Sequence, residues 1–348
     1  LTEESRWSHP MRHIATKHNL QKAFSEAYQW CSRNRKKHPP SSDIWDFRRS
    51  WKDRADAVID AFARGEYQFK VQKRMTLSNG EAIAVWSRWD ALVLKVLTWI
   101  VQEKLKSVLL KSCYHLKGNG GLKGAVRDVM AQYRNHRFFC KTDVRSYYAS
   151  IDHYTLLIRL HDFIHDSKII GYVWQFLNRC VEWGGLYQDI SRGIPRGSSL
   201  SPLLGAFYLM ELDKKMKKLE VKYFRYMDDI LILATTRWKL KKAIRVLNQT
   251  FDELKLEKHP DKTSIGRIEK GFDILGYHFN PDGLGIATAT VERFMKKAYR
   301  LYEQEPGENE HSPRLGMYVK RWLLWTLTLP FGDQFLLAAC VKVPLLAD

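Results

Sequence analysis

Two adjacent aspartates, Asp228 and Asp229, stand between two apolar runs at 223–227 and 230–233. Apolar and β-branched residues on both sides of a short polar pair are typical of a β-hairpin, whose turn would fall at 227–229. Two carboxylates this close repel each other, and each raises the pKa of the other unless a cation compensates. Mg²⁺ favours carboxylate oxygens together with substrate phosphates. A solvated Asp-Asp turn on a protein surface is the alternative that the dipeptide leaves open.

The charge of the whole chain narrows this choice. Lys and Arg number 57 against 38 Asp and Glu, which gives a net charge of +19 over 348 residues. An excess of this size predicts a polyanionic partner, with a phosphate backbone as the first candidate and a merely soluble basic protein as the alternative. Hydrophobic residues make up 45% of the chain, so a sizeable core can form.

Cysteine usage and hydropathy bear on the compartment. None of the five cysteines forms a C-x-x-C pair, so neither a zinc ribbon nor a disulfide framework is indicated. We expect no signal peptide. The apolar segment 322–346 is interrupted by Pro330, Gly332, Asp333 and Lys342, which predicts a buried helix with a tail rather than a membrane span. These features favour a cytoplasmic protein without a membrane partner.

The order of predicted elements defines the fold class. We expect helices up to about residue 65, strands over 66–90 with a turn at Ser78–Gly80, and a buried helix over 90–112. A strand over 138–144 carries Asp143, and Asp152 is predicted to cap a helix over 154–164. Ser201 is predicted to cap the next helix, with Pro202 in its first position.

After the Asp-Asp hairpin we expect a helix over 240–254, strands at 264–268 and 272–279, a polar linker at 303–312 and a basic helix over 314–329. This order predicts an α+β fold in which helices cover one face of an antiparallel sheet.

Five motifs follow one another along residues 67–279. They are Lys141–Tyr148 around Asp143, Gly193–Pro202, Tyr226–Asp229, Lys262–Thr263 and Phe272–Tyr277. In this order and at these spacings the chain resembles reverse transcriptases, in particular the prokaryotic group of group II intron, retron, diversity-generating and phage-defence enzymes.

The resemblance implies a right-hand polymerase and a set of domain boundaries. The expected domains are a helical basic extension at 1–65, fingers at 66–137, a palm at 138–285 with a fingers insertion around 153–192, and a small helical thumb with C-terminal helices at 286–348.

The resemblance also implies a metal site. Asp143 and Asp228 would ligate Mg²⁺ with Asp229 alongside, and the backbone carbonyl of Val144 would complete one site. Two such ions, with Mn²⁺ as a substitute, would clamp the attacking and leaving oxygens of phosphoryl transfer. Lys262 would protonate the leaving pyrophosphate, with a core or surface role as its alternative.

Further residues are assigned to nucleotide binding by resemblance. Tyr148 would gate against a ribose 2′-hydroxyl, with ordinary aromatic packing as the alternative. Arg196 and Gly197 lie in the motif that positions template and nucleotide, but the family usually has Gln where Arg196 stands. Glu81 replaces an arginine found in group II intron enzymes, which leaves solvated charges as the alternative for the candidate triphosphate-binding cations. These cations are Lys73, Arg74 and Arg88.

The function implied is RNA-directed DNA synthesis, which adds dNTPs to a primer 3′ end. We expect a stand-alone bacterial enzyme of anti-phage defence or of a retroelement. Its partners would be a structured non-coding RNA template and a DNA primer and product, together with a second copy or another protein subunit. Untemplated or protein-primed DNA synthesis is one alternative, and an RNA-binding maturase-like scaffold is another.

Overall fold

The chain is divided into two compact units whose segments alternate along the sequence. The first unit is Leu1–Leu110, Arg145–Glu211 and Thr250–Glu257, and the second is Lys111–Val144, Leu212–Gln249 and Lys258–Asp348. The computed structural model describes residues 17–33, 38–76, 80, 82–304 and 313–327. Several sequence predictions lie outside these ranges: residues 1–16, Ser78, Asn79, Glu81, linker residues 305–312 and the segment beyond residue 327.

Helices build the N-terminal part of the first unit, as the sequence predicts. Aromatic rings fill the contacts between them, and Phe24 packs edge-on against Phe62 while Phe47 packs against Trp89. The predicted buried helix begins at Arg88, where the Ser87 side chain accepts a hydrogen bond from the Asp90 N–H, and ends at Leu105 rather than near residue 112. The four helices are α1 (Lys17–Cys31), α2 (Ile44–Arg49), α3 (Trp51–Arg64) and α4 (Arg88–Leu105).

A four-stranded sheet of order β2-β1-β4-β5 completes this part. The predicted strands of residues 66–90 are found as an antiparallel pair, and β4 joins β1 in parallel. The hairpin β4–β5 was not predicted, and it turns at Gly184 and Gly185, whose φ values of 59° and 86° favour glycine. The strands are β1 (Gln72–Thr76), β2 (Ala82–Val85), β4 (Cys180–Trp183) and β5 (Leu186–Asp189).

Four more helices belong to the first unit. Asp152 caps its helix as predicted, because its carboxylate accepts a hydrogen bond from the Thr155 N–H at 2.8 Å. The capping prediction for Ser201 is wrong: Leu200 holds the cap position, and the Ser201 hydroxyl instead donates to the Pro195 carbonyl at 2.5 Å. The helices are α6 (Tyr147–Ser150), α7 (His153–His161), α8 (Ser167–Leu177) and α9 (Ser201–Tyr208).

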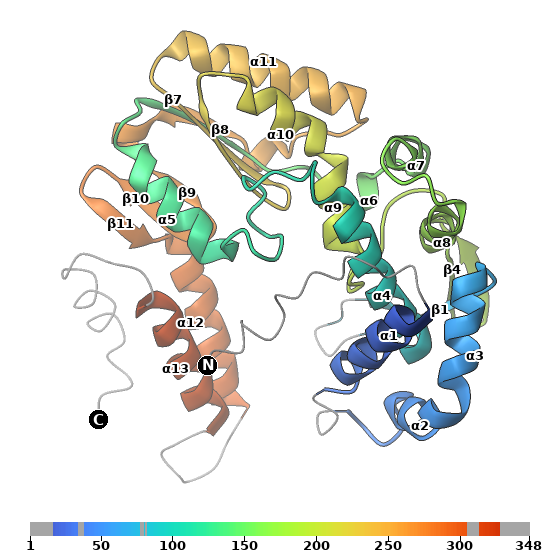
Figure 1. Cartoon of the computed structure of the whole chain (residues 1–348). Helices are drawn as coiled ribbons and strands as arrows, with labels where there is room; N and C mark the ends of the chain where they lie inside the picture. The colour runs from blue at the N-terminus through green and yellow to red at the C-terminus, as the bar shows by residue number, and fades with distance from the viewer. Residues whose placement is uncertain (1–16, 34–37, 77–79, 81, 305–312, 328–348) are drawn as a thin grey trace. The chain divides into compact units, whose positions relative to one another are not determined.

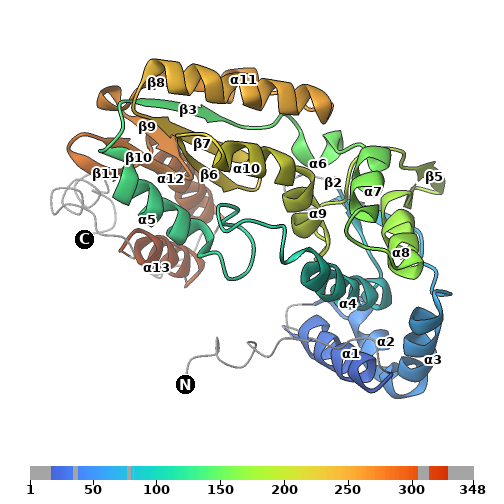
Figure 2. The same ribbon diagram turned by 45° about the horizontal axis from the view of Figure 1, so that its top comes forward.

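The second unit is built on an antiparallel sheet of order β6-β7-β3-β8 (Figures 1 and 2). The predicted hairpin is confirmed as β6 and β7, and β3 lies beside β7 with Phe139 opposite Leu233. Leu231, Leu233, Phe139 and Phe224 are buried in one core. The strands are β3 (Phe138–Thr142), β6 (Lys222–Tyr226), β7 (Asp229–Ala234) and β8 (Ser264–Arg267).

That core is shared with helix α5 (Gly121–Tyr133) and a second, three-stranded sheet (Figure 1). The strand predicted over 272–279 is two strands, because Leu275 and Gly276 take left-handed conformations with φ of 52° and 87° and turn the chain. The strands are β9 (Phe272–Ile274), β10 (Tyr277–Asn280) and β11 (Gly283–Ile286).

The helix predicted over 240–254 is found as α11 (Arg237–Glu253), and α10 (Met210–Lys217) precedes the hairpin. Helices α12 (Thr288–Glu303) and α13 (Pro313–Leu327) lie side by side (Figures 1 and 2). Phe294 of α12 stacks on Trp322 of α13 at 4.1 Å, and Trp325 stacks on Tyr277 at 4.7 Å. None of the described helices is both long and apolar enough to cross a membrane.

Candidate active site

Three aspartates meet at one edge of the β6-β7-β3-β8 sheet. Asp143 directly follows β3, and Asp228 and Asp229 form the end of the β6–β7 hairpin. Thr142 on β3 pairs with Ile230 on β7, so the adjacent antiparallel strands bring the three carboxylates to the same edge. Met227 has φ of 57°, the left-handed conformation that lets the hairpin turn within two residues.

The electrostatics of this edge follow from burial and shared charge. Burial, followed by hydrogen bonding to Asp143 and the charge of Asp143, raises the pKa of Asp228 to about 7. The pKa of Asp229 is also raised, first by burial and then by the Asp143 charge. Protein groups therefore compensate the like charges of these carboxylates only in part. A bound cation would reduce the remaining repulsion between them.

Lys262 supplies one compensating charge. It ends the short turn Pro260–Lys262, and its ammonium group forms an ion pair with the Asp143 carboxylate. This hydrogen bond raises the pKa of Lys262. The turn is tied to β3 because the His259 N–H donates to the Asp143 carbonyl at 2.8 Å and the Thr142 and Thr263 hydroxyls lie 2.8 Å apart.

Carboxylate oxygens are the donors that hard divalent ions prefer, so this set of residues fits such an ion. In the part of the chain that the structure describes, no three His, Cys, Asp or Glu side chains already form a ready cation cluster. The Asp143 carboxylate is engaged by Lys262. Metal binding would therefore require the carboxylate to share or exchange that partner. Val144, whose backbone carbonyl was predicted as a further ligand, is buried directly after Asp143.

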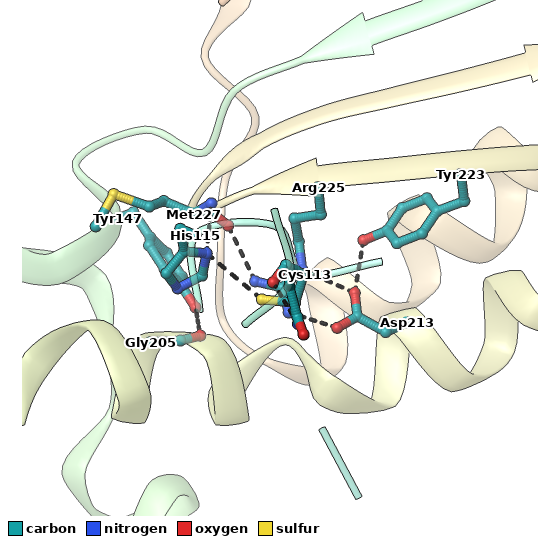
Figure 3. Close-up of polar contacts among 9 residues, drawn as sticks. Cys113, His115, Tyr147, Gly205, Asp213, Tyr223, Arg225 and Met227 are labelled. Atoms are coloured by element: carbon teal, nitrogen blue, oxygen red, sulfur yellow. Dashed lines mark hydrogen bonds and ion pairs between the residues drawn. The ribbon is translucent and has the colours of Figure 1, made fainter. Parts of the chain in front are cut away.

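A buried ion pair supports the Asp-Asp turn, and sequence reasoning missed it (Figure 3). The Arg225 guanidinium donates to both oxygens of Asp213, and the two side chains are 0% and 1% exposed. The Tyr223 hydroxyl donates to the same carboxylate at 2.8 Å. Arg225 also donates to the Met227 carbonyl at 3.0 Å, so the pair reaches the turn itself.

The segment 112–115 holds the other side of the turn. It bonds to β6 along the backbone, because the Arg225 N–H donates to the Ser112 carbonyl and the Tyr114 N–H to the Arg225 carbonyl. The Met227 N–H donates to His115 Nδ1 at 2.9 Å (Figure 3). Both backbone polar groups of Met227 are thus bonded, which fixes the residue between Tyr226 and Asp228.

The remaining predicted site residues belong to the first unit. Tyr148 lies on α6, and its carbonyl accepts a hydrogen bond from the Ile194 N–H at 2.8 Å. Gly193 has φ of 84°, and a Cβ there would meet the backbone of residues 148 and 149 at 2.9 Å. This close approach places Tyr148 beside the loop that carries Arg196 and Gly197, both exposed.

The predicted triphosphate-binding cations are in different surroundings. Lys73 and Arg74 lie exposed on β1. The Arg74 guanidinium lies 3.5 Å from the centre of the Trp183 ring. Arg88 forms an ion pair with Asp43 at 3.4 Å at the start of α4.

Comparison with known proteins agrees with this arrangement. Residues 89–279 match the family model described as "Reverse transcriptase (RNA-dependent DNA polymerase)". The chain is 24% identical over 173 residues to the group II intron-encoded protein LtrA of Lactococcus lactis subsp. cremoris, a match covering 48% of this chain and 29% of LtrA. It is 23% identical over 262 residues to YkfC of Escherichia coli K12, covering 63% and 69%. The chain thus spans under a third of LtrA.

A structural relative supports the fold. The apo telomerase of Candida tropicalis, truncated from its C-terminal domain, superposes with a TM-score of 0.51 at 15% identity, over 68% of this chain and 60% of that one. This likeness confirms the predicted α+β right-hand polymerase fold. Since the family model spans more than half of the 348 residues, including all three aspartates, the chain belongs to the reverse transcriptase family.

Proposed function

We propose that this chain is an RNA-directed DNA polymerase that adds dNTPs to a primer 3′ end. The observation that carries the proposal is the meeting of Asp143 with Asp228 and Asp229 at one sheet edge, where burial and the Asp143 carboxylate raise the pKa of both hairpin acids. Phosphoryl transfer needs little covalent help from a protein, so catalysis rests on positioning and on offsetting charge.

Divalent ions, with Mg²⁺ first and Mn²⁺ as a substitute, would be held by Asp143 and Asp228, with Asp229 alongside and the Val144 carbonyl completing the set. When bound, two such ions supply a lower pKa at the primer 3′-hydroxyl and offset the charge of the transferring phosphoryl group. The carboxylates contribute by holding their charge at the end of two paired strands.

Lys262 fits the role of proton donor to the departing pyrophosphate. Its ion pair with the Asp143 carboxylate holds the ammonium group at the aspartate site. The side chain is 56% exposed, which leaves it accessible to a bound nucleotide. A positioned acid of this kind contributes about 10²- to 10⁴-fold to a rate.

The proposed partners are an RNA template, a DNA primer and dNTPs, and the net charge of +19 supports a polyanionic partner. We further propose a bacterial cytoplasmic enzyme of anti-phage defence or of a retroelement, acting on a structured non-coding RNA. Sequencing the RNA that copurifies with the chain, with any attached cDNA, tests this assignment.

Replacing both hairpin acids, Asp228→Asn with Asp229→Asn, tests the polymerase proposal. We expect incorporation of dNTPs on an RNA template with a DNA primer to fall at least about 1,000-fold, because several kcal/mol of charge stabilisation are lost. Asp282→Asn is the matched control, since Asp282 is an exposed acid of the same unit. Full activity in the double variant, with an unchanged melting temperature, would refute the proposal.

Arg196 favours one second candidate, untemplated or protein-primed DNA synthesis. It stands exposed where the family usually has Gln in the template-positioning motif. Products made on defined templates separate the two functions, because only templated synthesis copies the template sequence.

A further inference from the structure

The first unit contains a cavity of about 460 Å³, which none of the three aspartates lines. Its volume lies within the range of small-ligand sites. It is lined by Arg74, Val181, Trp183, Gly184, Leu186 and Gln188. None of these six residues is acidic, and one carries a positive charge.

The lining residues share one face of the sheet because of the strand register. Val181 pairs with Gln188 and Trp183 with Leu186 across the β4–β5 hairpin, and alternate residues of a strand face the same side. On the neighbouring parallel strand, Lys73 pairs with Glu182, so the next residue, Arg74, falls beside Trp183. The cavity is therefore a sheet face rather than a gap between loops.

The floor of the cavity is a stacked cation and aromatic ring. The Arg74 guanidinium lies 3.5 Å from the Trp183 ring centre. Trp183 nevertheless remains 48% exposed, and Leu186 at its side is 78% exposed. Both side chains line the cavity, so they offer apolar and aromatic surface to a ligand there.

The chemistry of this floor selects a flat, aromatic and anionic ligand. A guanidinium stacked on an indole offers a planar surface for a further ring, and its N–H edges remain able to donate to phosphate. Sheet faces with exposed aromatics bind unpaired bases of RNA strands by stacking. The Gln188 amide adds a donor and an acceptor at the rim.

We propose that an unpaired base of a single-stranded RNA stacks on the Arg74–Trp183 pair, with its phosphate on the Arg74 guanidinium. The inference rests on the proposed function because the RNA strand that the site would hold is the template of the proposed polymerase. None of its residues belongs to the aspartate site. Arg74 is also a candidate triphosphate-binding cation, so binding is measured without dNTPs and the decisive variant is Trp183→Ala. Loss of polymerase activity and loss of this site are therefore distinguishable.

The test is a double-mutant cycle in which the Trp183 ring is removed from the protein and one base is removed from the RNA. The full chain binds a fluorescein-labelled unstructured RNA of about a dozen nucleotides, and anisotropy is measured at fixed salt. Versions of the RNA with one abasic position are compared. We expect Trp183→Ala to weaken binding of the intact RNA about 5- to 100-fold, the range for one stacked base. An abasic position should weaken wild-type binding similarly and add little in Trp183→Ala.

Matched variants separate stacking from unfolding and from charge. Trp174→Ala removes a tryptophan of the same unit that is 54% exposed, and should leave affinity unchanged. Trp183→Tyr should restore most of the affinity. Arg74→Gln should lower the slope of log affinity against log salt by about 0.7. Melting temperatures establish that each variant is folded.

Two results would overturn the proposal. One is an equal loss from the abasic position in wild type and Trp183→Ala, since the base would then stack elsewhere. The other is an unchanged affinity for the intact RNA in Trp183→Ala with a wild-type melting temperature, since the ring would then contribute nothing to binding. Primer extension by the wild type is measured in parallel and reports on the proposed function alone. Failure to extend a primer would reject that function, whereas the RNA-binding results decide on the Arg74–Trp183 site.

Discussion

At the scale of single residues, the carboxylate of Asp228 has the most altered chemistry of the three acids. Burial and the Asp143 carboxylate raise its pKa to about 7, against an ordinary value of 3.8. Without a bound cation, the folded chain therefore holds a proton that the unfolded chain releases. Folding is coupled to pH through that proton.

The sign of this coupling gives a testable prediction. Because the folded pKa lies above the unfolded one, the stabilising contribution is complete below about pH 4 and is lost as the pH rises toward 7. In buffer without divalent ions, we expect the free energy of unfolding of Asp228→Asn to gain on that of the wild type over this interval. Urea titrations at pH 4, 5.5 and 7.5 measure the difference. A difference that stays constant with pH would contradict the prediction.

Tyr148 carries the second prediction at this scale. If its ring gates against the ribose 2′-hydroxyl, Tyr148→Ala should admit ribonucleotides and reduce the preference for dNTPs by at least about tenfold, the effect of about 1.4 kcal/mol. The ratio of kcat/KM for a dNTP and its matching rNTP is the measurement. Tyr148→Phe serves as the control because it keeps the ring. Unchanged sugar discrimination in the alanine variant would remove Tyr148 from this role.

At the scale of elements, the Asp-Asp turn depends on groups that are not themselves acids of the site. Arg225 on β6 joins Asp213 to the Met227 carbonyl, and His115 accepts from the Met227 N–H. A buried charge pair of this kind is strongly coupled, because removal of one partner leaves the other without compensation.

Replacing Arg225 separates stability from turn geometry. We expect Arg225→Met to lower the free energy of unfolding by about 3–5 kcal/mol, since Asp213 stays buried and charged. Arg225→Met combined with Asp213→Leu should recover most of this loss. The recovered protein should still incorporate dNTPs more slowly, because the Met227 carbonyl has lost the Arg225 donor. Urea unfolding and primer extension measure the two effects, and full recovery of both would show that the turn does not need Arg225.

Helices and strands with a clear hydrophobic periodicity could be predicted from the sequence. Short elements, and those that depend on contacts distant in sequence, could not. The hairpin around Asp228 and helix α11 follow clear alternating and helical patterns. The four-residue strands β4 and β5 carry too few residues for a pattern, and β4 is stabilised by pairing with β1, far away in sequence. Ser201 has the chemistry of a helix cap, but the Pro195 carbonyl takes its hydroxyl.

At the scale of the whole molecule, the site could be predicted only through the order of its motifs. Periodicity places Asp143 at a strand end, but its meeting with Asp228 depends on the register of β3 beside β7. The family resemblance supplied that neighbour, whereas the Arg225–Asp213 pair escaped both kinds of reasoning. A charged residue within the apolar run 223–227 was the signal that could have indicated it.

The alternation of the two units along the chain has a consequence for how such a protein can change. The backbone passes from one unit to the other after residues 110, 144, 211, 249 and 257. Neither unit is therefore encoded by one continuous segment of the coding sequence. A single recombination event cannot exchange either unit whole, in contrast to domains joined by one linker. New domains are therefore more readily added outside this interleaved region than substituted within it. The two units are expected to be inherited together.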